Sequence, residues 1–177
     1  MKRLCVIAAM VVAGWAVNPG QALACAELQP NIQVGDPFKS VVDHVLASSP
    51  TFSRQCERIA ALPMVRVSIR ALPKEEQSCC RARTTIRRYS SGALIAWIEI
   101  PSLATELEYA ELLGHEFEHI LEQIDLVDLE AQADQGAGAR RVEDGAYETE
   151  RACLAGEAVA LETTIPRTTP AKIPPQR

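Results

Sequence analysis

The amphipathic pattern that begins at Thr105 constrains the fold of this chain more than any other feature. Apolar residues recur there at helical spacing, namely Ala110, Leu113, Phe117, Ile120, Ile124 and Val127. Thr105 and Glu108 stand three residues apart, which is the spacing of a helix capping box. The pattern predicts one long helix that packs its apolar stripe against a core.

Three runs before this helix show the patterns of β-strands. Residues 65–71 alternate between apolar and polar side chains, which is the period of a half-buried strand. Residues 84–89 and 93–100 are rich in β-forming residues and are joined by Ser90-Ser91-Gly92, a link typical of a hairpin. We therefore expect a small sheet before the long helix.

The segments on either side complete the expected order of elements. Residues 36–61 fit two short helices separated by Pro50, and the polar residues 130–145 predict a loop. Residues 146–162 show a second helical pattern, and four prolines predict a disordered tail over residues 163–177. This order is that of a single α+β domain over residues 25–162.

The N-terminus has the pattern of a signal peptide over residues 1–24. Three residues that include Lys2 and Arg3 precede an apolar run from Leu4 to Val17, and Ala22-Leu23-Ala24 offers a cleavage site. The apolar run is shorter than the roughly 20 residues that span a bilayer. Cleavage would leave Cys25 first, but Ala22 and Leu23 stand in the reverse of the usual lipoprotein order. We expect a periplasmic or secreted protein without a lipid anchor.

Five cysteines remain after cleavage: Cys25, Cys56, Cys79, Cys80 and Cys153. An exported protein meets conditions in which disulfides persist. A bridge from Cys56 to Cys79 or Cys80 is expected because these residues flank one predicted strand, although spacing does not fix the pairing. Zinc binding by the thiols is the alternative, and the absence of a CxxC pair disfavours it.

The net charge of −5 gives the chain no broad basic surface for nucleic acid or anionic membranes. A local cluster is the exception, and its members are Arg81, Arg83, Arg87 and Arg88. The simplest interpretation is a solvated strand face, and an anionic partner is the alternative.

The long predicted helix contains the sequence His115-Glu116-Phe117-Glu118-His119, an HExxH pattern. Two histidines four residues apart lie on one face of a helix, so both imidazoles can bind one tetrahedral metal ion. Helix geometry turns this pair away from the apolar stripe around Phe117 and toward a cleft. The other acids of the helix are expected on its solvated face, and they are Glu106, Glu108, Glu111, Glu118, Glu122 and Asp125.

An HExxH helix followed by a helix that offers a glutamate resembles the zincin superfamily, and its gluzincin branch in particular. The resemblance covers roughly residues 93–162. It implies a minimal zincin-like fold with a small antiparallel sheet, Zn²⁺ bound by His115 and His119, Glu116 as the base that activates water, and a later glutamate as third ligand. No histidine follows His119, which excludes the metzincin pattern.

The acids that could be this third ligand are Glu143, Asp144, Glu148, Glu150 and Glu157. Glu148 shares a predicted helix face with Ala152, Ala155, Gly156 and Val159, small residues suited to close helix packing. This run also resembles the second-helix signature of exported bacterial zincin-like proteins. Glu148 is our prediction, and Glu150 is the alternative. Gluzincins usually have an Asp four residues after the third ligand, and Ala152 stands there in this chain. An alanine cannot form the hydrogen bond that would orient a metal-binding histidine.

The resemblance implies a zinc peptidase whose substrate is a peptide or protein. The strand over residues 93–100 could hold an extended peptide if it forms a sheet edge, and otherwise it is a core strand. His44 and Tyr147 are candidate oxyanion donors, and each also fits a structural role. The alternative function is a zinc-binding envelope protein without turnover. Its metal site would be the same as that of the peptidase, and the two would differ only in activity.

Overall fold

The computed structural model describes residues 28–73, 81–101, 105–142 and 145–164. The expected signal peptide and residues 165–177 of the expected tail lie outside these ranges. The elements, in order, are β1 (Ile32–Val34), η1 (Asp36–Phe38), α1 (Lys39–Ser48), α2 (Pro50–Ala60), β2 (Val65–Ala71), β3 (Arg83–Arg88), β4 (Leu94–Ile100), α3 (Glu106–Ile124), α4 (Leu129–Gln135), β5 (Ala139–Arg141), β6 (Tyr147–Thr149) and α5 (Glu150–Thr164). The α+β class is confirmed.

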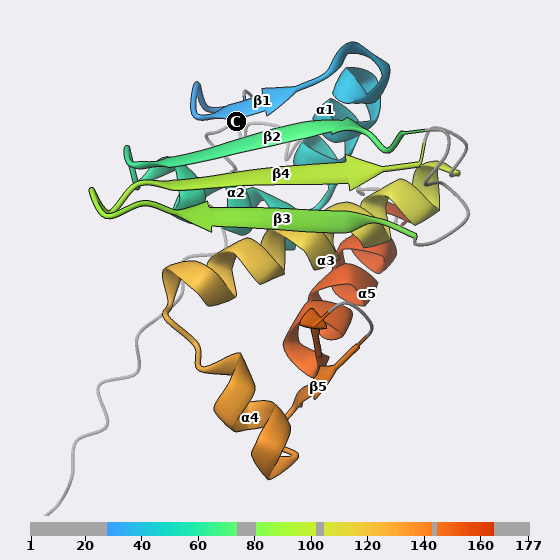
Figure 1. The fold of residues 1–177 in the computed structure, drawn as a ribbon. Helices are drawn as coiled ribbons and strands as arrows, with labels where there is room; N and C mark the ends of the chain where they lie inside the picture. The colour runs from blue at the N-terminus through green and yellow to red at the C-terminus, as the bar shows by residue number, and fades with distance from the viewer. Residues whose placement is uncertain (1–27, 74–80, 102–104, 143–144, 165–177) are drawn as a thin grey trace, which may run out of the picture.

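Four strands form one mixed sheet in the order β1-β2-β4-β3 (Figure 1). β1 and β2 are parallel, β2 and β4 are parallel, and only β3 and β4 form the predicted antiparallel hairpin. The expected antiparallel sheet is therefore wrong. The chain passes through η1, α1 and α2 between β1 and β2, a connection long enough to return to a parallel strand.

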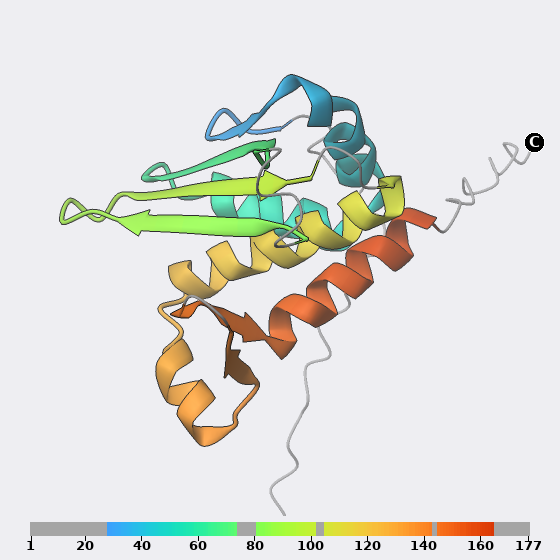
Figure 2. The same cartoon turned by 45° about the vertical axis from the view of Figure 1, so that its right-hand side comes forward.

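All the helices that contact the sheet lie on one of its faces, and the opposite face is left uncovered by them (Figures 1 and 2). The strand pattern explains this arrangement, because the inward residues are apolar and buried, such as Val67, Ala96 and Ile98. The predicted stripe of α3 enters the same core, where Phe117 meets Phe52 of α2 edge-on at 4.8 Å between ring centres.

α3 begins where the sequence predicted. Thr105 accepts a hydrogen bond from the backbone N–H of Glu108, and the Glu108 carboxylate accepts one from the N–H of Thr105, so the capping box is complete. α2 begins with Pro50 at its first turn, and Ser49 caps it by accepting from the N–H of Phe52.

α3 and α5 run side by side and in close contact (Figure 2). Glycines allow this approach: a Cβ atom at Gly114 would lie 2.6 Å from Val159, and one at Gly156 would lie 2.8 Å from the backbone oxygen of Glu111. Ala152, Gly156 and Val159 are buried in the contact. The predicted packing of a small-residue stripe is thus confirmed.

The region between α3 and α5 departs from the predicted loop and helix. It contains α4 and the hairpin of β5 and β6, which extend below the sheet and α3 in Figure 1. α5 begins at Glu150 rather than near residue 146, so Glu148 lies on a strand and not on the second helix. Tertiary pairing with β5 overrides the helical pattern of these residues.

The C-terminal end of α5 also differs slightly from the prediction, since Thr163 and Thr164 belong to the helix. Pro166 disfavours helical geometry in the residue before it, which is consistent with a helix that continues to Thr164. No helix in the described ranges is long and apolar enough to cross a membrane.

The close contact of α3 and α5 predicts that Gly114→Ala destabilises the protein by about 1–3 kcal/mol, because the added methyl overlaps Val159. Helix propensity alone predicts the opposite sign, a gain of up to about 1 kcal/mol. Urea unfolding with a chelator present measures the effect without a contribution from metal. A variant more stable than the parent protein would contradict the packing argument.

Candidate metal centre

The two histidines of the HExxH sequence lie on the side of α3 that faces α5 and β6. Their side chains are 19% and 15% exposed for His115 and His119. The ring nitrogens Nε2 of the two residues are 3.2 Å apart, and the rings are nearly perpendicular. The backbone at Gly156 passes close to the Cβ of His115, so the α3–α5 contact limits where this imidazole can lie.

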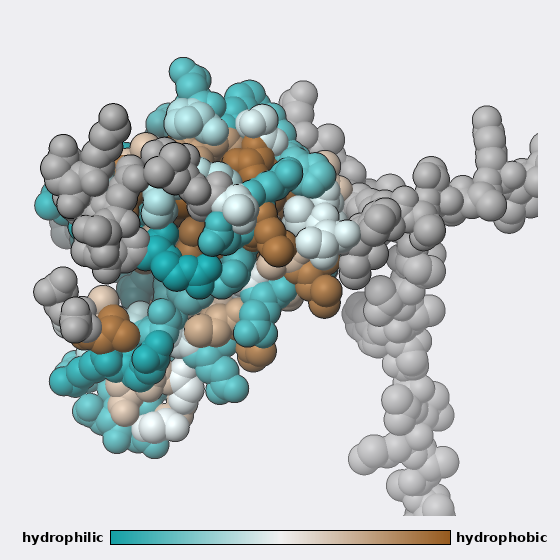
Figure 3. Space-filling model, turned by 90° about the vertical axis from the view of Figure 1, so that its right-hand side faces the viewer, coloured by the Kyte–Doolittle hydropathy of each residue, from teal (hydrophilic) through white to brown (hydrophobic). Residues whose placement is uncertain are grey.

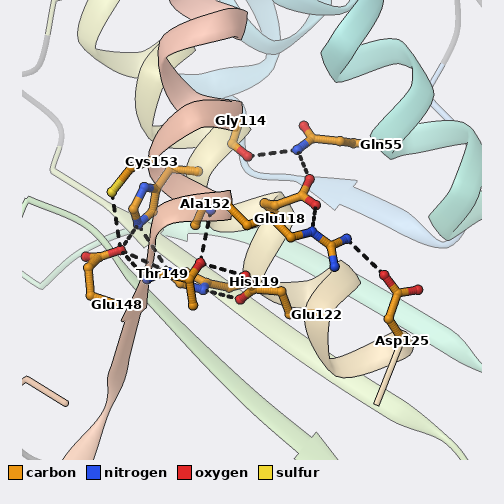
Figure 4. A network of polar contacts seen from close by, with 12 residues as sticks. Gln55, Gly114, Glu118, His119, Glu122, Asp125, Glu148, Thr149, Ala152 and Cys153 are labelled. Atoms are coloured by element: carbon orange, nitrogen blue, oxygen red, sulfur yellow. Dashed lines mark hydrogen bonds and ion pairs between the residues drawn. The ribbon is translucent and has the colours of Figure 1, made fainter. Parts of the chain in front are cut away.

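Glu148, the middle residue of β6, joins the pair (Figure 4). Its Oε1 atom lies 3.1 Å from Nε2 of His115 and 3.7 Å from Nε2 of His119. The backbone N–H of Thr149 also donates to Oε1, at 3.2 Å, which fixes the direction of the carboxylate. The structure therefore brings the three predicted ligands together, although Glu148 comes from a different element than predicted.

The spacing of these three atoms fits a tetrahedral zinc ion. Zinc binds imidazole nitrogen and carboxylate oxygen at about 2.0–2.2 Å, so two ligand atoms in a tetrahedron lie about 3.3–3.6 Å apart. The observed separations of 3.1, 3.2 and 3.7 Å surround that range. Two imidazole nitrogens and a carboxylate are also a donor set that zinc prefers, and three protein ligands leave a fourth position open.

Glu122 contacts the ring nitrogen of His119 that does not face His115. Its Oε2 atom lies 2.9 Å from Nδ1 of His119, and its Oε1 atom accepts a hydrogen bond of 2.6 Å from the hydroxyl of Thr149. Because Glu122 holds the proton of Nδ1, Nε2 is the nitrogen of His119 that would bind a metal ion. The same hydroxyl accepts from the N–H of Ala152 and so caps α5. One chain of contacts thus links His119 to the start of α5.

The charges of this cluster stabilise one another. Burial alone lowers the pKa of His119, but the carboxylates of Glu122, Glu148 and Glu116 outweigh it and raise this pKa to about 10. Hydrogen bonds with His115 and His119 hold the pKa of Glu148 well below its usual range, against the opposing effect of burial. A metal ion would have to displace the proton of His119, since only neutral imidazole binds metal.

Glu116 lies inside the molecule beside this cluster. Its side chain is buried, and burial raises the pKa of its carboxyl above the ordinary value, while Thr84, His119 and His115 act in the opposite direction. Thr84 belongs to the inner face of β3, and its buried hydroxyl has no hydrogen-bond partner of normal length among the described residues. A raised pKa makes this carboxylate a better proton acceptor than an exposed glutamate.

A second polar network holds α5 against α2 and α3. Glu118 accepts hydrogen bonds from Gln55 of α2 at 2.7 Å and from Arg151 of α5 at 2.5 Å. Gln55 also donates to the backbone oxygen of Gly114, and Arg151 continues to Asp125 (Figure 4). These contacts fix the start of α5, and with it the adjacent Glu148, relative to α3.

The prediction that the remaining acids of the long helix form its solvated face is therefore wrong for two of them. Glu118 and Glu122 are buried, with 8% and 1% exposure. α5 covers this face of α3 and supplies the partners Arg151 and Thr149. The sequence carried one usable signal, because Glu122 follows His119 by three residues and so lies next to it on a helix.

Cys153 of α5 is a further neighbour that the sequence did not identify. Its sulfur atom lies 3.9 Å from Oε1 of Glu148, and one ligand atom each of His115, Glu148 and Cys153 fall within 4.8 Å of one another. The predicted bridge from Cys56 concerns Cys79 and Cys80, which lie outside the described residues, so that prediction is not tested.

The other predicted site residues lie away from the three ligand atoms. Glu150 is exposed and its carboxylate lies beside Gly138. His44 contacts Glu106 at the start of α3, at 3.6 Å, about 13 Å of helix rise before His115. Tyr147 packs under the guanidinium of Arg141. These contacts give neither His44 nor Tyr147 a role as oxyanion donor.

The surface is hollowed and largely hydrophilic between the body that carries the sheet and the part that carries α4 and β5 (Figure 3). Comparison of the chain with protein-family models, with curated proteins and with solved structures gives no match.

The contact between Glu122 and His119 predicts that Glu122→Gln lowers the affinity for zinc about 10–100-fold, because the amide orients the imidazole less well than the carboxylate. Competition with a zinc chelator measures the affinity. Glu111→Gln is the matched control, since Glu111 lies on the same helix and pairs with Arg81 at the surface. Equal affinities in both variants would contradict the role of Glu122.

Proposed function

We propose that this protein is a zinc-dependent hydrolase that cleaves peptide bonds. His115, His119 and Glu148 would hold the ion, and Glu116 would act as the general base. The observation that supports the proposal best is the triangle of ligand atoms, whose sides of 3.1–3.7 Å match a tetrahedral zinc site. The buried carboxylate of Glu116 next to this triangle supplies the second component that a hydrolase requires.

Zinc, when bound, would act as a Lewis acid that polarises the scissile carbonyl and makes water acidic enough to react at neutral pH. Glu116 would accept the proton of the attacking water on its carboxylate and return it to the leaving amine. Burial raises the pKa of this carboxyl above its ordinary value, which favours its acceptance of a proton. Glu122 and Thr149 would hold His119 in one orientation throughout.

The edge of the sheet offers a place for an extended substrate. β4 lies between β2 and β3, so the strand over residues 93–100 is a core strand, and β3 is one of the two edge strands. No described strand pairs with the outer side of β3, which leaves its backbone groups able to bind a peptide by strand addition. Thr84 of this strand faces Glu116, so a peptide added there would pass near the site.

The same site also fits a zinc-binding protein without turnover. The observation in its favour is that neither His44 nor Tyr147 faces the ligand atoms, which leaves the oxyanion donor unassigned. In either case the signal pattern of residues 1–24 supports a protein that acts in the periplasm or outside the cell.

The proposal predicts about one zinc ion per chain. His115→Ala, His119→Ala and Glu148→Ala should each lower the affinity at least about a hundredfold, since each removes one of three ligands. Glu150→Ala is the matched control, because Glu150 is exposed, lies two residues from Glu148 and should leave binding unchanged. Mass spectrometry of the native protein and chelator competition give the measurements.

Two results would contradict the ligand assignment. If the reconstituted parent protein contained no zinc, both metal-based functions would be excluded. If Glu150→Ala lost the metal and Glu148→Ala kept it, the assignment of Glu148 as third ligand would be wrong, while the assignment of His115 and His119 would be unaffected.

A further prediction separates catalysis from binding. Glu116→Gln should keep zinc and the fold but lower kcat about 10²–10⁴-fold on a mixed peptide library, because an amide cannot accept the proton of water. Glu148→Ala should lose activity together with zinc. If the parent protein and Glu116→Gln bound zinc equally and were equally inert, the peptidase proposal would fall and the non-catalytic function would remain.

A further inference from the structure

The outer face of the sheet carries a regular array of side chains that the metal centre does not use. The register places Arg66, Ile95 and Arg87 in one row across β2, β4 and β3. Ser68, Trp97 and Thr85 form the next row, and Arg70, Glu99 and Arg83 form the third. Four arginines thus surround one tryptophan, and Glu99 is the only carboxylate in these three rows.

Glu99 holds the two arginines of the third row, Arg70 and Arg83, in place. Its side chain is only 5% exposed, and its two oxygens bind different arginines, with Oε1 2.9 Å from Arg70 and Oε2 2.6 Å from Arg83. A buried carboxylate held by two guanidinium groups keeps both in place, because leaving it unpaired is costly. Arg70 and Arg83 are thereby held side by side at this end of the array.

Arg87 and Arg66 at the other end form no ion pair with a described acid. Both are exposed strand residues. A shallow hollow of about 390 Å³ opens between the two ends, and its lining is Arg70, Arg83, Thr85, Arg87, Trp97 and Glu99. The face is therefore cationic, although the whole chain carries a net charge of −5. Such a concentration of charge favours an anionic partner.

The form of the surface indicates which anion fits it. Trp97 is half-buried, lines the hollow and belongs to the middle row of the array, so it offers apolar indole surface there and does not project for insertion into a lipid bilayer. Sheets that bind single-stranded nucleic acid stack successive bases on two or three aromatic rings, whereas these rows hold one. A pyranose ring presents C–H groups that pack on one indole, and its acidic substituents can reach arginines at both ends.

We propose that the outer face of the sheet binds an acidic saccharide, with a sugar ring on Trp97 and its carboxylate or phosphate groups held by Arg87 and by the Arg70–Arg83 pair. Guanidinium groups bind both kinds of oxyanion through paired hydrogen bonds. This site lies on the opposite side of the sheet from α3, so it is separate from the metal centre and does not depend on the proposed peptidase activity.

Tryptophan fluorescence tests the proposal directly. The chain has two tryptophans, and Trp15→Phe leaves Trp97 as the only one whether or not the leader is present. Oligogalacturonate and a phosphorylated oligomannose are the probes, and at least one should change the fluorescence in a saturable way. Methyl-esterified oligogalacturonate, which has the same rings without charge, and polyphosphate, which has charge without rings, should not.

Three substitutions in this background locate the site. Arg87→Ala should raise the Kd for the saccharide about tenfold, the effect of losing charge-assisted hydrogen bonds. Arg66→Ala should raise it less than about threefold, because Arg66 does not line the hollow. Arg54→Ala removes the same charge from the exposed side of α2 and should have no effect. Circular dichroism checks that each variant folds.

Several outcomes would overturn the proposal. Among these are the failure of both acidic saccharides to bind, equal binding of the methyl ester or of polyphosphate, and equal losses for Arg87→Ala and Arg66→Ala. Tighter binding of oligothymidylate or of phosphatidylglycerol vesicles would assign the face to nucleic acid or to a membrane instead.

Discussion

The close approach of α3 and α5 is the contact on which the arrangement of this molecule depends. Gly114 and Gly156 bring the two backbones so near that a methyl group at either position would overlap the other helix. The distance between the helices decides whether Glu148, which lies two residues before the first residue of α5, can reach the histidines of α3. A wider spacing would leave the donor atoms too far apart to share one ion. Close packing is thus a condition for the chemistry of the site.

Buried charge is the second consequence of this contact. α5 covers the face of α3 that carries Glu118 and Glu122, and carboxylates cannot be buried without partners. Arg151 and Gln55 satisfy Glu118, and Thr149 and His119 satisfy Glu122. Glu122 in turn orients His119, and Arg151 and Thr149 anchor the start of α5. The same hydrogen bonds therefore stabilise the buried carboxylates and position the candidate ligands.

Local patterns in the sequence predict the elements whose determinants are local. The capping box at Thr105 and the hairpin at Gly92 were found because each depends on residues a few positions apart. The sequence patterns do not predict the parallel pairing of β1, β2 and β4, since it joins β1 to β2 across η1, α1 and α2, and β2 to β4 across β3. The helical pattern predicts an exposed Glu122. The side chain is instead buried against Thr149, which follows it by 27 residues and which a local pattern cannot bring to it. The histidine pair needed only helix geometry, whereas the strand that carries Glu148 needed its partner β5.

The position of Glu148 at a junction between strand and helix determines where this chain can change in length. Side-chain direction turns by about 180° per residue along a strand and by about 100° along a helix. One residue inserted between Glu148 and Ala152 would rotate the carboxylate away from His115 and displace the Thr149 hydroxyl that caps α5. Related chains should therefore keep the four residues from Glu148 to Arg151 in register.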